Sequence, residues 1–513
     1  MQNLLSLTGI GRRIGDRARF LLVAVTVLLP GAALAERVAL IIGNADYEYV
    51  GTLKNTINDA RDIGATLEMI GFDVTLVLDA TQTELIDALD EFAFRAETAD
   101  LALIYYAGHG VEIQGVNYFI PIDAEIRSNQ DIQRLAVSLD QVLEAVDAAR
   151  VMRVVIIDAC RNSPFSDLID TSVSPDGTVA ADGTTRGAGV AGLAAVDPDR
   201  GTLIAYAQRP GEVSLDGVGD NSPFAAALVN NLTEPGLEIG LMFRQVRDEV
   251  LAGTRNLQEP YVNNSLTGTP FFLAGPAEGQ IDVATIADPQ QAWANLSIDQ
   301  EAQLIAQAEI GDTRSLLGLA YVRLNPQDSR YNLAEAVSYL ERAAAAGMPD
   351  AQFELAKLYE QGIGVAADPA RALDLYRASA AQEFPDAIND LGFLYYNGGL
   401  GLTADPAAAL DYFRQAADLR HPEALFNYAT LIDIGQIAGK GPQEAGDYLY
   451  LAIRSGSQAV FDQLMADPTA FSVEARMALQ AKLQQNAFYA GSLDGDFGPG
   501  TQAAIRVAYG LTE

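Results

Sequence analysis

The chain has 513 residues, a hydrophobic content of 49% and a formal net charge of −35 from 33 basic and 68 acidic side chains. This length suffices for two to four domains, and the apolar content argues against a wholly disordered chain. Nucleic acid is excluded as an expected partner because its phosphates require a basic surface. A strongly acidic chain does permit basic partners or substrates.

The first 35 residues have the pattern of an export signal. Four arginines precede an apolar run at Phe20–Leu29, and Ala33-Leu34-Ala35 matches a cleavage site. We therefore expect residues 1–35 to be a signal peptide and the protein to be exported to the periplasm or cell envelope. A retained anchor is the alternative, but the run is shorter than the ~20 residues that a spanning helix needs.

Strands and helices alternate between residues 37 and 274, which predicts a three-layer α/β domain. The expected strands are Arg37–Gly43, Phe72–Leu78, Leu101–Tyr106, Met152–Ile157 and Gly201–Ala207, with Phe271–Leu273 as a strand that could close the sheet. The expected helices are Leu53–Gly71, Thr81–Thr98, Val137–Ala149, Pro223–Leu232 and Leu241–Leu251, and a hairpin is expected over Val111–Ile120.

The only cysteine and one of the two histidines follow two of these strands. Cys160 comes shortly after the apolar run Val154–Ile157, and His109 comes shortly after Leu101–Tyr106. The carboxyl ends of parallel strands meet at one sheet edge, where open α/β sheets usually carry their chemistry. The other histidine, His421, lies in a different part of the chain. We interpret Cys160 and His109 as a catalytic dyad; the alternative is a packed thiol and a turn histidine.

The dyad interpretation assigns further roles near it. A thiol attacks a carbonyl as thiolate, and an imidazole can generate the thiolate and then protonate the leaving amine. The developing oxyanion needs backbone N–H donors, for which Gly110 and Cys160 are the candidates. Asp158 could hold a cationic substrate side chain, with arginine preferred for bidentate pairing. Its alternative role is to cap a turn.

Metal and cofactor sites have little support in the sequence. One cysteine and two histidines do not make an ordinary zinc site, and a Walker loop and a strand followed by G-x-G-x-x-G are both absent. We expect no cofactor and no metal site; activation by calcium stays open as an alternative, although the sequence does not support it. The absence of G-x-S-x-G weakens a serine-hydrolase interpretation.

Helical repeats with a period of 36–37 residues occupy residues 293–465, after an expected linker at 275–292. The segments that begin at Asp350 and Asp386 each contain a helix, a glycine-rich turn, Asp-Pro and a second helix, and two weaker copies flank them. Stacked units of this kind form an α-solenoid with a concave surface for partners. The alternative is a spacer that binds nothing.

Residues 37–274 resemble the caspase-like cysteine peptidases, in particular the bacterial metacaspase-like (orthocaspase) members. The resemblance is carried by R-V-A-L-I-I-G-N-A-D-Y (37–47), N-D-A (58–60), Y-Y-A-G-H-G (105–110), V-I-I-D-A-C-R-N (155–162) and N-S-P-F-A-A-A-L (221–228). It implies a mainly parallel six-stranded sheet, with His109 as general base and Cys160 as nucleophile. It also implies that Asp158 and Asp59 line a pocket for Arg or Lys before the scissile bond, because D-A-C stands where caspases have Q-A-C.

The repeats resemble the Sel-one-like relatives of tetratricopeptide repeats, and residues 474–513 resemble a shortened peptidoglycan-binding module. The whole chain is predicted to be an exported cysteine endopeptidase that acts on protein or peptide substrates. Protein partners of the repeats and peptidoglycan are further expected partners. The alternative is a non-proteolytic scaffold or regulatory protein that uses the repeats to recruit partners at the cell envelope.

Overall fold

The structure is a computed structural model that describes residues 37–160, 193, 201–209, 214–215, 219–266, 270–275, 293 and 298–511. The expected signal peptide, nearly all of the expected linker and nearly all of the connection from 161 to 200 lie outside these residues. The chain divides near residue 297 into two compact units, and each is described by itself.

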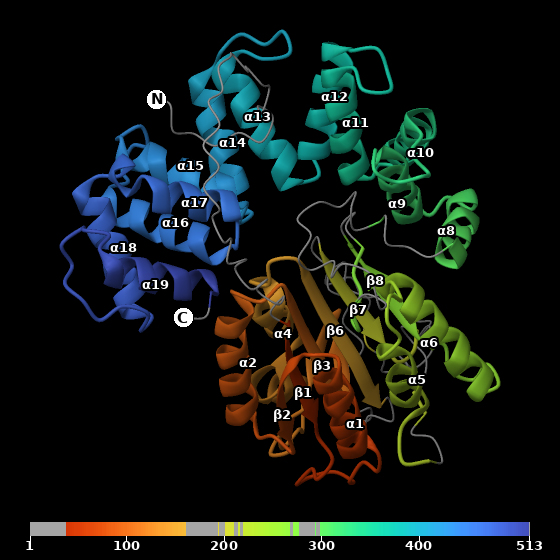
Figure 1. The fold of residues 1–513 in the computed structure, drawn as a ribbon. Helices are drawn as coiled ribbons and strands as arrows, with labels where there is room; N and C mark the ends of the chain where they lie inside the picture. The colour runs from red at the N-terminus through yellow and green to blue at the C-terminus, as the bar shows by residue number, and fades with distance from the viewer. Residues whose placement is uncertain are drawn as a thin grey trace, which may run out of the picture. The chain divides into compact units, whose positions relative to one another are not determined.

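The N-terminal unit is built on a mainly parallel sheet, as predicted. Its main strands follow the order β2-β1-β3-β6-β7-β8 (Figure 1). All neighbours along this path run parallel except β7 and β8, which are antiparallel. The bounds are β1 Arg37–Gly43, β2 Asp73–Leu78, β3 Leu101–Ile113, β6 Met152–Cys160, β7 Thr202–Tyr206 and β8 Tyr261–Asn264.

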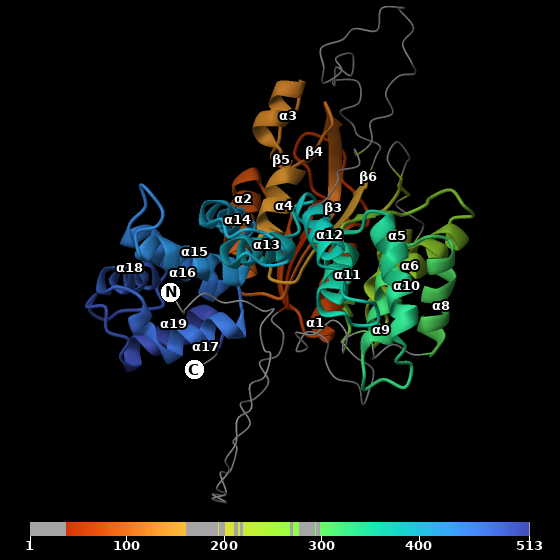
Figure 2. The ribbon, with the colours of Figure 1, turned by 90° about the horizontal axis from the view of Figure 1, so that it is seen from above.

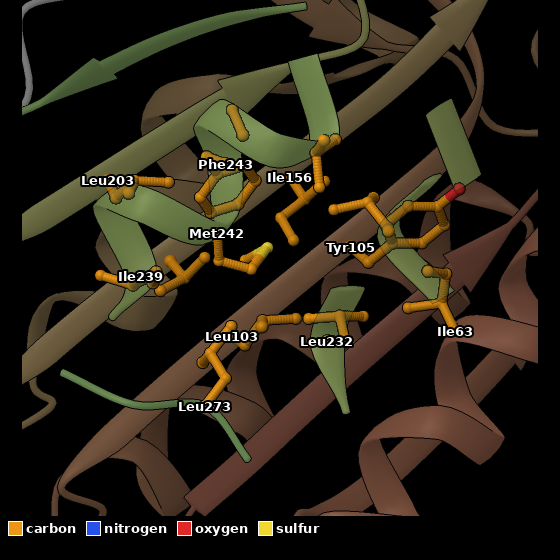
Figure 3. Packing of buried hydrophobic residues seen from close by; sticks show 14 of the residues in the cluster. Ile63, Leu103, Tyr105, Ile156, Leu203, Leu232, Ile239, Met242, Phe243 and Leu273 are labelled. Atoms are coloured by element: carbon orange, nitrogen blue, oxygen red, sulfur yellow. The ribbon is translucent and has the colours of Figure 1, made fainter. Parts of the chain in front are cut away.

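Helices cover both faces of the sheet and make the domain three layers deep. On one face lie α1 (Thr56–Met69), α5 (Pro223–Leu232) and α6 (Ile239–Gly253), and on the other lie α2 (Gln82–Ala96) and α4 (Leu139–Asp147). Figure 3 shows the first face, where Leu103, Ile156 and Leu203 of the sheet meet Met242 and Phe243 of α6. Both faces are buried, which explains why β1 and β7 are continuous apolar runs.

Two central strands are longer than their sequences suggested. β3 was expected to end at Tyr106, but it continues to Ile113 and pairs with β4 (Val116–Phe119) in an antiparallel hairpin. β6 was expected to end at Ile157 and continues to Cys160. Small residues after each apolar run resembled loops, but pairing with the neighbouring strand keeps these segments extended. His109 and Cys160 therefore lie within strands.

The last residues of β3 pair with β4, β4 pairs in turn with β5 (Val137–Ser138), and α3 (Asn129–Leu135) comes between β4 and β5 in the chain (Figure 2). The sequence interpretation missed α3, a short helix that Ser128 caps by accepting a hydrogen bond from the Asp131 N–H. It also placed the start of a helix at Val137, where the chain first forms β5.

The expected closing strand at Phe271–Leu273 is wrong. The sheet edge is β8, and the later segment makes only an isolated bridge between Phe272 and Glu238. Phe271 and Leu273 are buried in the core between the sheet and α6. Their apolar character therefore reflects burial rather than strand pairing.

The second unit begins with α8 (Ile298–Glu309) and continues as four pairs of helices (Figure 1). The pairs are α9 Thr313–Leu324 with α10 Leu333–Ala345, α11 Pro349–Gln361 with α12 Pro369–Ala380, α13 Pro385–Asn397 with α14 Pro406–Asp418, and α15 Pro422–Asp433 with α16 Pro442–Arg454. Glycines with positive φ, Gly362 and Gly398, end α11 and α13. Asp368 and Asp405 then cap the next helices, which each begin with proline.

The C-terminal helices pack on the end of these repeats. They are α17 Gln458–Ala466, α18 Val473–Gln485 and α19 Pro499–Tyr509, with a short 3-10 turn at Pro468–Ala470. A Cβ on Gly446 of α16 would lie 2.5 Å from Ala478 Cβ, so α18 approaches α16 very closely. Leu449, Leu479 and Ile505 belong to one apolar core.

In the described part of the chain, no helix combines the length and the apolar character that crossing a bilayer would require.

Candidate active site

His109 and Cys160 lie opposite each other on neighbouring strands. They are partners in the parallel register of β3 and β6, which also pairs Ala107 with Asp158 and Gly108 with Ala159. The sequence placed the two residues at one edge of a sheet, and the structure places their backbones side by side, with His109 inside β3 and Cys160 at the last residue of β6.

Two tyrosine hydroxyls hold the backbone of His109. The Tyr47 hydroxyl accepts a hydrogen bond from the His109 N–H at 2.8 Å, and the Tyr106 hydroxyl donates one to the His109 carbonyl at 2.8 Å. The Tyr47 ring also contacts the imidazole, with centroids 4.6 Å apart and an interplanar angle of 49°. His109 is 3% exposed. Its position is therefore fixed by both tyrosines as well as by the sheet.

The strand pairing sets the direction of the Gly110 N–H. Ile120 donates its N–H to the His109 carbonyl at 3.0 Å, so the His109 carbonyl faces β4. Peptide groups along a strand alternate in direction, and Gly110 and Phe119 form a pair that does not exchange hydrogen bonds. The N–H of Gly110 consequently faces the opposite side of β3, where β6 ends at Cys160.

Residue 110 must be small. A Cβ there would lie 2.9 Å from Ala159 Cβ, closer than side chains normally approach. The absence of a side chain lets β3 and β6 stay paired to the last residue of β6, which is Cys160.

Ser222 joins the two aspartates that were assigned to a specificity pocket. Its hydroxyl donates a hydrogen bond to Asp158 Oδ2 at 2.6 Å, and its backbone N–H donates one to Asp59 Oδ1 at 3.0 Å. The same hydroxyl accepts from the Ala225 N–H and caps α5. Asp158 and Asp59 are 3% and 2% exposed. Residues from β6, α1 and the start of α5 thus form one acidic group.

Tyr105 links this acidic group to the core. Its ring lies among the apolar side chains between the sheet and the helices, and its hydroxyl points out of that cluster (Figure 3). The hydroxyl donates to Asp158 Oδ2 at 3.3 Å. Hydrogen bonds from neutral donors thereby fix the orientation of a buried carboxylate two residues before Cys160.

Sequence reasoning missed the four residues that support these groups, namely Ser222, Tyr105, Tyr47 and Tyr106. Ser222 had a readable signal, because a serine before proline at the start of a helix is a typical N-cap. The three tyrosines lie in the segments that carry the family resemblance, but nothing in the local pattern assigns them a hydrogen bond, since a tyrosine next to an apolar run predicts only burial. Among the described residues, no group of His, Cys, Asp and Glu side chains is arranged to hold a metal ion.

Comparison with known families divides the chain in the same way as the structure. A model of the caspase domain matches residues 36–271. The N-terminal domain of this chain is a caspase domain. Sel1 repeat models match residues 313–348, 349–384, 385–421 and 422–457, and a peptidoglycan binding domain model matches residues 472–508. The caspase domain is therefore followed by four Sel1 repeats and a C-terminal module.

Two curated relatives support the assignment of the caspase domain. They are the mucosa-associated lymphoid tissue lymphoma translocation protein 1 of Homo sapiens and its homologue of Mus musculus, each 31% identical over 136 residues. The match covers 26% of this chain and only 16% of either relative. A crystal structure of a Sel1 repeat protein from Oxalobacter formigenes is 31% identical and covers 23% of this chain and 88% of that chain, with a TM-score of 0.22.

Proposed function

We propose that the caspase domain is a cysteine endopeptidase with Cys160 as nucleophile and His109 as general base. The supporting observation is that these two residues form the last pair of the ladder between the adjacent strands β3 and β6. His109 takes the thiol proton, and the thiolate attacks the peptide carbonyl to form a C–S bond. Collapse of this intermediate breaks the C–N bond, and His109 gives the proton to the leaving amine. Water then hydrolyses the thioester to a carboxylic acid and regenerates the thiol.

The oxyanion of each tetrahedral intermediate would be stabilised by the N–H groups of Gly110 and Cys160. The strand pairing supports Gly110 in this role, because its N–H faces the side of β3 on which Cys160 lies. Donors fixed by a β-ladder need no rearrangement as charge develops, which is the condition for strong stabilisation.

Asp158 and Asp59 would select an Arg or Lys side chain before the scissile bond. Both carboxylates are buried, both are hydrogen-bonded to Ser222, and one of them precedes the nucleophile by two residues. A guanidinium could bridge two carboxylates through paired hydrogen bonds, whereas an ammonium acts as a point charge. We therefore expect arginine to be preferred over lysine.

The side chains of the domain would supply the nucleophile and the proton carrier, so we propose that no resident cofactor takes part. Protein or peptide chains would be the substrates. The Sel1 repeats would bind protein partners, and the C-terminal module would associate the protein with peptidoglycan at the cell envelope, consistent with export by the expected signal peptide. The competing function is a scaffold whose caspase domain is not catalytic.

Turnover of fluorogenic peptides tests this function. The protein and its Cys160→Ala variant would be given peptides with Arg, Lys or Asp before the reporter, each with and without calcium. We expect hydrolysis of the Arg and Lys peptides that disappears in the variant and does not require calcium. Hydrolysis after Asp would support the peptidase activity but refute the proposed role of Asp158 and Asp59 in a pocket for basic side chains. Turnover that survives in the Cys160→Ala variant would refute the dyad.

A further inference from the structure

Tyr47 makes two separate contacts with His109, and the proposed mechanism uses neither. Its hydroxyl accepts the His109 N–H at 2.8 Å, while its ring lies 4.6 Å from the imidazole. Tyr47 is only 7% exposed, and it comes from the loop after β1 rather than from the strand that carries His109. A single side chain therefore governs both the backbone and the ring of the candidate base.

The loop that carries Tyr47 is itself firmly held. Asp79 Oδ1 accepts hydrogen bonds from the N–H groups of Ala45 at 2.7 Å and Asp46 at 2.9 Å. The Tyr47 N–H donates to the Ala45 carbonyl at 3.1 Å. Functional groups stay within a fraction of an ångström of their working geometry only when such supporting contacts exist.

Gly108 shows how closely the tyrosines approach the strand. A Cβ at this position would lie 2.6 Å from the Tyr106 hydroxyl and 2.8 Å from the Tyr47 hydroxyl. The two hydroxyls therefore occupy the space that a side chain would need, immediately before His109. This close approach explains the glycine on the amino side of the histidine.

We propose that Tyr47 is a positioning residue that sets the tilt of the His109 imidazole relative to the end of β6. The proposal rests on the proposed peptidase function, because it assigns Tyr47 a role in proton transfer by His109. The hydroxyl fixes the peptide plane from which the side chain leaves, and the ring limits rotation of the imidazole. A displacement of a reacting group by about 1 Å costs on the order of 100-fold in rate.

Kinetics of two variants separate the hydroxyl from the ring. Tyr47→Phe removes only the hydroxyl and is expected to lower kcat about fivefold, because one backbone hydrogen bond is lost. Tyr47→Leu also removes the ring and is expected to lower kcat by about 100-fold, with KM changed by less than about threefold. Tyr49→Phe is the matched control, since Tyr49 is 53% exposed two residues away in the same loop.

Two further measurements do not depend on peptide turnover. Both are specific to the site, because the chain has one cysteine and two histidines. With histidine labelled with ¹³C only at Cε1, the protein gives two ring signals, and His421→Phe assigns them. We expect Tyr47→Leu to shift and broaden the His109 signal while the His421 signal stays in place. Alkylation of Cys160 by iodoacetamide is expected to slow about fivefold in the same variant, because a misplaced imidazole leaves less thiolate.

These results distinguish the failure of the inference from the failure of the proposed function. An unshifted His109 signal and a wild-type alkylation rate in a folded Tyr47→Leu protein would overturn the inference. If the wild-type protein hydrolyses no peptide but the signal and the alkylation rate change as expected, the inference about positioning stands and the peptidase function fails. If Tyr47→Leu does not fold, Tyr47→Phe decides instead. The inference would then be overturned if Tyr47→Phe had the same kcat, the same His109 signal and the same alkylation rate as the Tyr49→Phe control.

Discussion

His109 on β3 and Cys160 on β6 are register partners across two parallel strands. A histidine and a cysteine that are 51 residues apart in sequence, 160 minus 109, thus meet at the last pair of the ladder. The sheet itself therefore sets their separation, with Gly110 and the two tyrosines restricting the histidine further.

The acidic pair predicts a preference that depends on charge rather than on shape. Wild-type protein should hydrolyse an Arg peptide at least about 100-fold faster, in kcat/KM, than the neutral citrulline peptide of the same shape, since buried charge pairs contribute about 2–5 kcal/mol. Asp158→Asn should abolish most of this preference. The preference is measured as the ratio of kcat/KM for the Arg peptide to kcat/KM for the citrulline peptide. An unchanged ratio in the variant would show that Asp158 does not line the pocket.

Ser222→Ala should weaken the same preference to a smaller extent. The variant loses the hydrogen bond to Asp158 Oδ2 but keeps the backbone N–H that Asp59 accepts. Loss of one hydrogen bond to a charged group costs about 1.5–3 kcal/mol, so we expect about a 10-fold to 100-fold fall in kcat/KM for the Arg peptide. An effect larger than that of Asp158→Asn would mean that Ser222 acts mainly by capping α5, which circular dichroism and thermal unfolding would show.

Gly110→Ala should separate the ends of β3 and β6. A Cβ at this position would meet Ala159 Cβ at 2.9 Å, so the backbone must shift near Cys160. We expect a loss of about 1–3 kcal/mol in the free energy of unfolding and a fall of at least about 100-fold in kcat. Gly51→Ala is the control, because nothing lies within 4 Å of a Cβ at that position. Full activity of Gly110→Ala would contradict the assigned geometry of the oxyanion donor.

The third and fourth Sel1 repeats should lose stability as pH rises. Burial and the neighbouring Asp386 raise the pKa of Asp390 to about 7, with His421 and Lys357 opposing and Glu360 adding to the increase. A raised pKa means that the folded state holds a proton that the unfolded state releases near pH 4. The resulting stability is present at acidic pH and is lost as pH rises through about 7.

His421 acts in the same direction. Burial lowers the pKa of His421, but two nearby carboxylates outweigh burial and raise this pKa above its ordinary value. Asp386 Oδ1 lies 3.8 Å from His421 Nε2, and Glu423 Oε2 lies 3.6 Å from His421 Nδ1. Its contribution is therefore also lost as pH rises. Hydrogen exchange of peptides from α13 and α15 should show about 2 kcal/mol less protection near pH 8 than near pH 5, and Asp390→Asn should flatten this dependence. Equal protection at both pH values would contradict the prediction.

Gln480 should be essential for the structure of the C-terminal loop that contains Asp494, Gly495 and Asp496. Its fully buried amide accepts the Gly495 N–H at 2.8 Å and donates to the Asp496 carbonyl at 2.9 Å. Hydrogen bonds from Ser492, Asp496 and Gln480 also lower the pKa of Asp494 to about 2, so this carboxylate stays charged in the loop. Gln480→Ala should lower the free energy of unfolding by about 1–3 kcal/mol because it leaves a buried N–H without an acceptor.

Gln484, one turn later in α18, is the matched control for this change. It makes one 3.5 Å contact with the Gly491 carbonyl at an exposed site, so Gln484→Ala should change stability by less than about 0.5 kcal/mol. Pull-down with peptidoglycan can be measured on the same two variants. Equal binding by both would show that the loop held by Gln480 is not the wall-binding surface.

The sequence predicted the alternating strands, the repeat period and the position of His109 and Cys160 near one edge. These features follow from local patterns, namely apolar runs and a recurring Asp-Pro. It did not predict that β3 and β6 extend to these residues, because Gly108 and Gly110 in β3 and Asp158-Ala159 in β6 have low intrinsic preference for strands. Tertiary pairing with β4 and β6 overrides that preference.

The links between the aspartates were also beyond local patterns. Asp59 and Ser222 are 163 residues apart, and only the packing of α1 beside α5 brings them together. The segment 161–200, which follows Cys160 directly, lies almost entirely outside the described residues.

Covalent labelling by a peptide chloromethyl ketone tests the central claim most directly. Such a reagent alkylates a nucleophilic thiol much faster when its peptide occupies the specificity pocket, so labelling at low reagent concentration examines the nucleophile and the pocket together. We expect the reagent that ends in Arg to label Cys160, as mapped by mass spectrometry, and the reagent that ends in Asp to leave it unmodified at the same concentration. The Asp158→Asn substitution should reduce labelling by the reagent that ends in Arg. Equal labelling by both reagents, or labelling elsewhere than at Cys160, would contradict the account.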